Sequence, residues 1–165
     1  MSLQLRLQLE VPSQCDAQLE FMKQAEMDVG SAAAISLAVS LINEEVNEEL
    51  LFAVEQLQKV MFIDGEISDT SSCQEQYQAL MTEVADGIVD SVYVLFQLAN
   101  TLGLPFDELF LAVHNNNMSK IQHDADGKLL KRTDGKLLKP EGYKKVELRS
   151  IVFPESAVVA GDSLH

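Results

Sequence analysis

A long apolar-periodic stretch, from about Gln74 to Leu102, most constrains what this chain can form. At about 100° per residue it predicts one α-helix in which polar residues share a single stripe, namely Glu83, Asp86, Asp90 and Gln97. Apolar residues cover most of the remaining circumference, which is typical of a buried helix. Carboxylates on a buried helix are costly unless a cation neutralises them, and divalent metals prefer such oxygens. The alternative is that the stripe is a solvated face.

A second apolar-periodic run, from about Ala32 to Val60, contains the acidic sequence NEEVNEE at residues 43–49. Glu45, Glu48 and Glu49 lie along one shoulder of its apolar stripe, because residues three and four apart share a helix face. Like charges at this spacing repel, so helix stability does not explain them. Two antiparallel helices with such carboxylates would form an oxygen-rich cage suited to Mg²⁺.

Bulk properties favour one helical domain and exclude some partners. The chain has 165 residues, is 47% hydrophobic and 6% aromatic, and carries a net charge of -14, which argues against binding to a nucleic-acid backbone. No apolar run reaches the roughly 20 residues of a membrane span, and the N-terminus has no signal-peptide pattern. Cys15 and Cys73 have no metal-like spacing. We therefore expect reduced thiols and a cytoplasmic location.

These patterns predict an all-α, antiparallel four-helix-type bundle with a minor β element from the termini. Alternating leucines and polar residues predict a strand extension over residues 1–12, paired with residues 146–153 or with another subunit. The helical bundle would span 13–122 and a basic C-terminal arm, 123–165, would pack on it.

Local signals set the expected helix ends. Ser13 is the expected N-cap of a helix that runs to about Met27. Gly103 would end the second long helix. Pro105 would begin another helix that ends near Ile121.

Nine of the twelve basic residues lie from Lys120 onward, eight of them within the arm. The sequence DGKLLK occurs at 126–131 and again at 134–139, and its Asp-Gly pairs favour hairpin-like turns. The arm could close over an anionic ligand, or it could be a basic tail docked on an acidic body.

The motifs Glu45-x-x-Glu48 and Glu83-x-x-Asp86 resemble the ExxE…ExxD pattern of the all-α nucleoside triphosphate pyrophosphohydrolases. That superfamily includes MazG, the dimeric dUTPases and phosphoribosyl-ATP pyrophosphohydrolase. VHNNNMSK at 113–120 and DGKLLKPEGY at 134–143 are similar to the MazG-like group of bacteria and phages. The resemblance covers roughly residues 19–152. Some relatives place the second pair one turn later, on Gly87 and Asp90.

The resemblance implies an Mg²⁺-dependent or Mn²⁺-dependent enzyme of nucleotide-pool sanitation that converts a nucleoside triphosphate and water to a monophosphate and pyrophosphate. It implies metal ligation by Glu45, Glu48, Glu83, Asp86 and Asp90, catalytic roles for Glu45, Glu48 and Glu49, and substrate contacts from Asn117, Lys120, Lys136 and Lys139. The expected partners are the nucleotide and further copies of the chain, as a homodimer or homotetramer, without membrane or nucleic acid. The alternatives are a non-catalytic nucleotide or metal binder and a structural helical oligomer.

Overall fold

The computed structural model describes residues 13–63, 66–67 and 74–154. This part of the chain is mostly helical, which confirms the predicted all-α class. The chain divides into two compact units, residues 1–104 and 105–165. The helix that follows Pro105 therefore groups with the tail, whereas the sequence places it in the bundle. The predicted N-terminal strand, residues 1–12, lies outside the described residues.

The first described helix, α2 (Gln14–Gln24), begins as the sequence predicts. The Ser13 hydroxyl accepts from the Asp16 backbone N–H at 3.1 Å, and the Asp16 carboxylate accepts from the Ser13 N–H at 3.3 Å. This reciprocal capping box satisfies two backbone donors that would otherwise lack partners at the helix start.

A continuous rod follows, made of α3 (Ala32–Ile42), η1 (Asn43–Leu50) and α4 (Leu51–Met61). Its ends agree with the predicted helix over 32–60. The middle segment, η1, is π-helical, with backbone bonds between residues five apart, and the sequence did not predict this. A short antiparallel pair, β1 (Phe62–Ile63) and β2 (Glu66–Ile67), comes after the rod.

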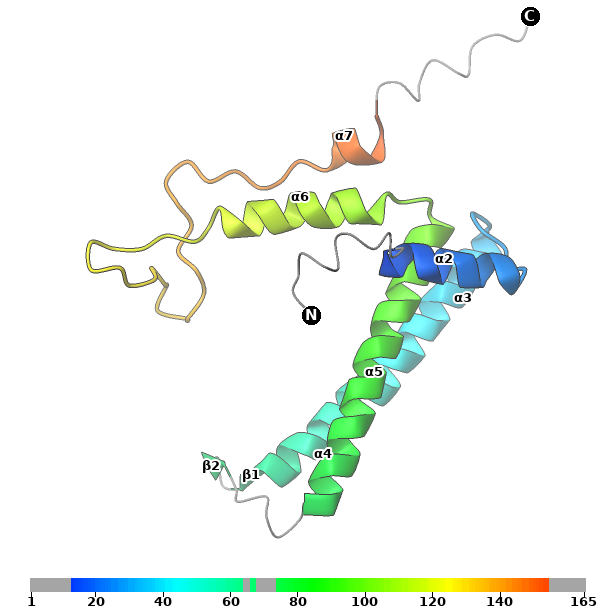
Figure 1. The fold of residues 1–165 in the computed structure, drawn as a ribbon, viewed down its shortest axis with the longest axis horizontal. Helices are drawn as coiled ribbons and strands as arrows, with labels where there is room; N and C mark the ends of the chain where they lie inside the picture. The colour runs from blue at the N-terminus through cyan, green and yellow to red at the C-terminus, as the bar shows by residue number, and fades with distance from the viewer. Residues whose placement is uncertain (1–12, 64–65, 68–73, 155–165) are drawn as a thin grey trace, which may run out of the picture. The chain divides into compact units, whose positions relative to one another are not determined.

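The helix α5 (Gln74–Thr101) runs beside the rod and contacts all three of its segments (Figure 1). Buried positions recur along it at Gly87, Ser91, Val94 and Thr101, which are spacings of the coiled-coil kind. Gly103, at φ 64°, ends this helix region as predicted, because glycine tolerates a positive φ. This packing brings the two predicted acidic helices side by side.

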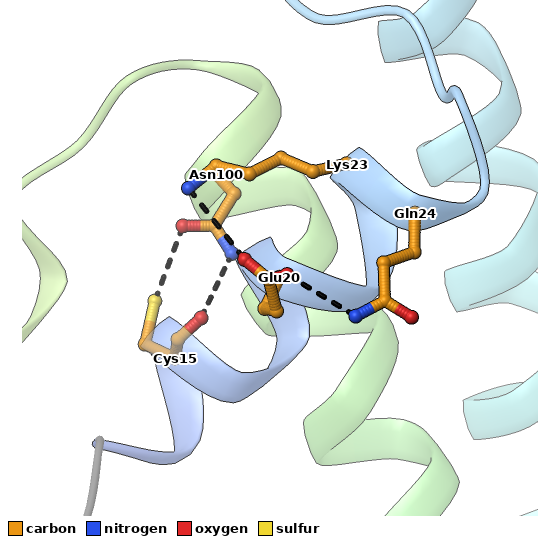
Figure 2. Close-up of polar contacts among 5 residues, drawn as sticks. All are labelled: Cys15, Glu20, Lys23, Gln24 and Asn100. Carbon is orange, nitrogen blue, oxygen red and sulfur yellow. Dashed lines mark hydrogen bonds and ion pairs between the residues drawn. The ribbon is translucent and has the colours of Figure 1, made fainter.

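Asn100 connects α2 to the C-terminal end of α5 (Figure 2). Its amide donates to the Cys15 carbonyl at 3.1 Å and to Gln18 Oε1 at 2.7 Å, and its Oδ1 accepts from the Cys15 thiol at 3.4 Å. Buried polar groups require such partners. Figure 2 also shows Glu20, which accepts from Gln24 and pairs with Lys23.

The prediction that α5 is buried on most sides is wrong for the chain by itself. Val89 is 62% exposed, and Ile88 and Leu95 are about half exposed. Among the described elements, the rod and α2 pack most extensively against α5. They cover one part of its circumference and leave an apolar face exposed.

The second unit begins with α6 (Phe106–Met118), which starts after Pro105 as predicted and ends slightly before Ile121. The repeated DGKLLK sequence forms two linked hairpin turns, with bridges between His123 and Leu129 and between Lys131 and Leu137. This confirms the predicted hairpin-like structure.

Residues 146–153 were one of the two predicted partners of the N-terminal strand. They instead contain a short helix, α7 (Arg149–Val152). That prediction is wrong, because four of those residues are helical. No helix in the described ranges is long and apolar enough to cross a membrane.

Candidate functional site

The π-helical segment η1 carries three of the predicted site residues, Glu45, Glu48 and Glu49, and an amide network holds Glu48. Asn43 donates from Nδ2 to Glu48 Oε1 at 2.8 Å, and Asn43 Oδ1 accepts from Asn47 Nδ2 at 3.0 Å. Asn43 and Glu48 are five residues apart, which is the repeat of a π-helix. The bond therefore fixes one carboxylate oxygen of Glu48 in this register. Sequence reasoning did not identify Asn43.

Carboxylates of η1 and α5 face a common hollow of about 240 Å³. Its polar lining consists of Glu48 and Glu49 from η1 and Glu83 and Asp86 from α5. The structure therefore brings together four predicted site residues from two helices that are distant in sequence. Phe52 is part of the same lining.

Glu45 and Asp90 belong to the same acidic region. Burial raises the pKa of Glu45, and the charges of Glu49, Asp90, Glu44 and Asp86 raise it further. The charges that raise this pKa come from residues of both η1 and α5, so the carboxylates of the two helices act on one another electrostatically. The predicted ligands thus lie along one stretch where η1 and α5 meet.

The acidic region lacks a basic counter-charge within the described part of the first unit. The two basic side chains described there, Lys23 and Lys59, pair elsewhere. Lys59 lies 3.0 Å from Glu55, and Lys23 lies 3.9 Å from Glu20. Gathered carboxylates without a cation repel one another. The donor set, all carboxylate oxygen, suits a hard divalent ion such as Mg²⁺.

The side chains do not converge on one point in this conformation. Across residues 13–63, 66–67 and 74–154, no three acidic, histidine or cysteine side chains are close enough together to hold one metal ion. The residues fit Mg²⁺ by donor type and by placement around one hollow. They would have to rotate toward one another to share the ion.

Three of the four predicted substrate-binding residues meet in the second unit around Tyr143. Lys120 Nζ lies 5.4 Å from the centre of the Tyr143 ring, and Lys139 Nζ lies 5.1 Å from it. Lys120 also donates to Asn117 Oδ1 at 2.6 Å. By contrast, Lys136 lies 4.0 Å from Asp134 and is not part of this group.

Tyr143 is held at this position by α6. Its hydroxyl donates to Asn116 Oδ1, and Asn116 Nδ2 donates to the Lys144 carbonyl at 2.9 Å. Two ammonium groups within cation–π distance of one aromatic ring form a cationic site around that ring. Sequence reasoning did not single out Tyr143, although its place among the lysines was a usable signal.

Neither the protein-family models nor the curated proteins give a match to this chain. The functional interpretation therefore depends on these residues and on the resemblance of their motifs.

Proposed function

We propose that this protein is a metal-dependent nucleoside triphosphate pyrophosphohydrolase. The observation that carries the proposal is the set of carboxylates that η1 and α5 present to one hollow without a basic partner in the described first unit. The spacing of Glu45 with Glu48 and of Glu83 with Asp86 supports it, through the resemblance to the all-α pyrophosphohydrolases.

In the proposed reaction, a water oxygen bonds to the α-phosphorus and the bond to the bridging oxygen breaks, which yields a monophosphate and pyrophosphate. Bound Mg²⁺ or Mn²⁺ would neutralise phosphate charge and lower the pKa of a bound water. Glu45, Glu48 and Asp86, with Glu83 or Asp90, would hold the metal. Glu49 lines the hollow beside Glu48 and would accept the proton from the attacking water.

The cationic site of the second unit would bind the phosphate chain. Lys120 and Lys139 would donate charge-assisted hydrogen bonds to phosphate oxygens, and Asn117 would orient Lys120 through the bond it already accepts. Lys136, 77% exposed beside Asp134, would have to leave that neighbour to take part.

We further propose that the chain forms a homodimer or homotetramer through the exposed apolar face of α5. This face includes a hollow of about 340 Å³ lined by Ile88, Val89, Val92 and Tyr93 together with Ala17 of α2. Contiguous exposed apolar surface of this kind marks interaction sites. A second copy would supply the further helices that a four-helix arrangement needs.

The direct test is pyrophosphate release from a panel of nucleoside triphosphates with Mg²⁺, with Mn²⁺ and with a chelator. Metal-dependent release from one or a few nucleotides is the expected result. Nucleotide binding without release would instead identify a non-catalytic binder. No release, together with a melting temperature that millimolar Mg²⁺ does not change, would contradict the proposal and favour a structural helical oligomer.

A further inference from the structure

Two amide side chains of η1 hold the Glu48 carboxylate in one orientation. Asn43 Nδ2 donates to Glu48 Oε1 at 2.8 Å, and Asn47 Nδ2 donates to Asn43 Oδ1 at 3.0 Å. An ionised carboxylate only accepts hydrogen bonds, so the Asn43 amide must turn its nitrogen toward Glu48. Its oxygen then faces the donor of Asn47. The two hydrogen bonds therefore agree on a single placement of the Asn43 side chain.

The π-helical register gives Glu48 this amide neighbour. In an α-helix the neighbours on one face are residues three and four apart, which would set Glu48 beside Glu45. A π-helix instead joins residues five apart, and the bond from Asn43 to Glu48 spans five positions within η1. The register and the bond thus support each other.

Glu48 needs such a support because its surroundings repel it. It is an exposed residue that lines the acidic hollow together with Glu49, Glu83 and Asp86. Repulsion between like charges favours a carboxylate that turns out into water, and fixing an exposed glutamate costs side-chain entropy. A neutral amide donor opposes both effects and keeps the charge of the carboxylate. A lysine at the same place would neutralise that charge and compete with a cation.

We infer that Asn43 is a positioning residue for the divalent metal and that it acts through Glu48. The inference rests on the proposed function, because that function places the ion among the carboxylates of the hollow. The bond to Asn43 occupies Oε1 of Glu48 and leaves Oε2 to bind the ion. A group that holds a metal ligand by a hydrogen bond raises metal affinity, since the ligand is already oriented when the ion arrives.

The test measures Mn²⁺ binding to the nucleotide-free protein by titration calorimetry, so that turnover contributes nothing. We expect Asn43→Ala to weaken Mn²⁺ binding about tenfold or more, as is usual when a metal ligand loses its hydrogen-bond partner. Asn47→Ala should weaken binding less, because Asn43 can still reach Glu48 but is no longer held in one orientation. Asn43→Gln keeps the amide donor and should retain more affinity than Asn43→Ala.

Melting curves distinguish this role from a role in helix stability alone. Alanine is a better helix former than asparagine, which offsets the lost hydrogen bond, so Asn43→Ala should melt near the wild-type temperature in a chelator. The increase in melting temperature that Mn²⁺ produces should be smaller in the variant, because the folded state binds the metal more weakly. A residue that only stabilised the helix would lower the melting temperature in the chelator and leave the Mn²⁺-dependent increase unchanged.

Gln24→Ala is the matched control. Gln24 Nε2 donates to Glu20 Oε1 at 3.1 Å, so it is also an amide that holds a carboxylate on an exposed helix face. Neither of these two residues lines the acidic hollow. This change should leave both the Mn²⁺ affinity and the Mn²⁺-dependent increase in melting temperature as they are in the wild type.

Unchanged or tighter Mn²⁺ binding in Asn43→Ala would overturn the inference, and tighter binding would mean that the ion has to draw Glu48 away from Asn43. Equal weakening by Gln24→Ala would also overturn it, because the effect would then not be specific to the hollow. Metal-dependent pyrophosphate release by the wild-type protein would leave the proposed function intact in each of these cases. A wild-type protein that binds no Mn²⁺ at millimolar concentration would instead refute the proposed function, and the inference with it.

Discussion

Gly87 of α5 lies directly against Leu50, the last residue of η1. A Cβ atom placed on Gly87 would be 3.2 Å from both the Cα and the Cβ of Leu50. Such a short distance leaves no room for a side chain between the two helices. The helices therefore approach closely beside Asp86 and Glu49, and this approach lets carboxylates from both helices line one hollow.

We predict that Gly87→Ala lowers the free energy of unfolding by about 1–3 kcal/mol through overpacking. Alanine favours an isolated helix by about 1 kcal/mol over glycine, but the atom that it would crowd is backbone and cannot rotate away. Urea unfolding measures the change. Ala85→Gly, at an exposed site of the same helix, is the control and should cost about 1 kcal/mol by propensity alone. A more stable Gly87→Ala protein would contradict the close packing.

The raised pKa of Glu45 predicts a pH-dependent stability. Between the ordinary value of 4.5 and the raised folded value, the folded state binds more protons than the unfolded state, so the free energy of unfolding falls as pH rises. Glu45→Gln should remove this dependence. In a chelator, the variant should be more stable than the wild type above the folded pKa, and the difference should vanish below pH 4.5.

Glu147 provides a comparison for that experiment, because its pKa is shifted in the opposite direction from that of Glu45. Hydrogen bonds from the Arg149 and Ser150 backbone N–H groups lower the pKa of Glu147, so its contribution to stability is lost as pH falls through the folded pKa. Unfolding curves across pH 3 to 8 would give the difference in unfolding free energy between each variant, Glu45→Gln or Glu147→Gln, and the wild type. The slope of this difference against pH should have opposite signs for the two variants. If this difference changed with pH in the same way for both variants, the neighbouring carboxylates would not act on Glu45.

We predict that Glu48→Gln and Asp86→Asn each abolish metal-dependent pyrophosphate release while the helical circular dichroism signal stays unchanged. Each change removes a charged oxygen ligand and keeps the size of the side chain. Glu55→Gln is the control, because Glu55 is an exposed residue of α4 that pairs with Lys59. Near-normal release in both site variants would exclude the metal role of the hollow.

Lys120→Ala should weaken binding of a triphosphate about tenfold and binding of the matching monophosphate much less. The reason is that an ammonium group interacts more strongly with the larger charge of the triphosphate. Competition binding without turnover measures both affinities. Lys128→Ala, an exposed lysine of the first hairpin turn, should change neither. Equal weakening of both nucleotides by Lys120→Ala would count against a phosphate role.

The exposed face of α5 predicts self-association. Val89 is 62% exposed within this face, so Val89→Glu should convert the oligomer to a monomer, because a charge at a closely packed apolar interface is costly. Sedimentation equilibrium measures the mass. Val29→Glu, at a residue 53% exposed in the connection before α3, should leave it unchanged. A wild-type protein that is already monomeric at micromolar concentration would refute the proposed assembly.

The sequence by itself determined the features that depend on near neighbours along the chain. The Ser13 cap, the ends of the two long helices and the stop at Gly103 could be predicted because each follows from local hydrogen bonding or local backbone freedom. The two hairpin turns of the tail could be predicted for the same reason, because each Asp-Gly pair favours the turn in which it lies. The carboxylates of the candidate site were also identified by their spacing.

Only the tertiary structure decided how these elements meet. No proline or glycine lies between Ala32 and Met61, so no local signal predicted the π-helical register of η1 or the bond from Asn43 to Glu48. The exposure of Val89, the hollow between η1 and α5 and the contact of Gly87 with Leu50 all depend on which faces of the helices meet. Periodicity defines the faces of a helix, but the choice of face that another helix covers comes from packing between segments distant in sequence.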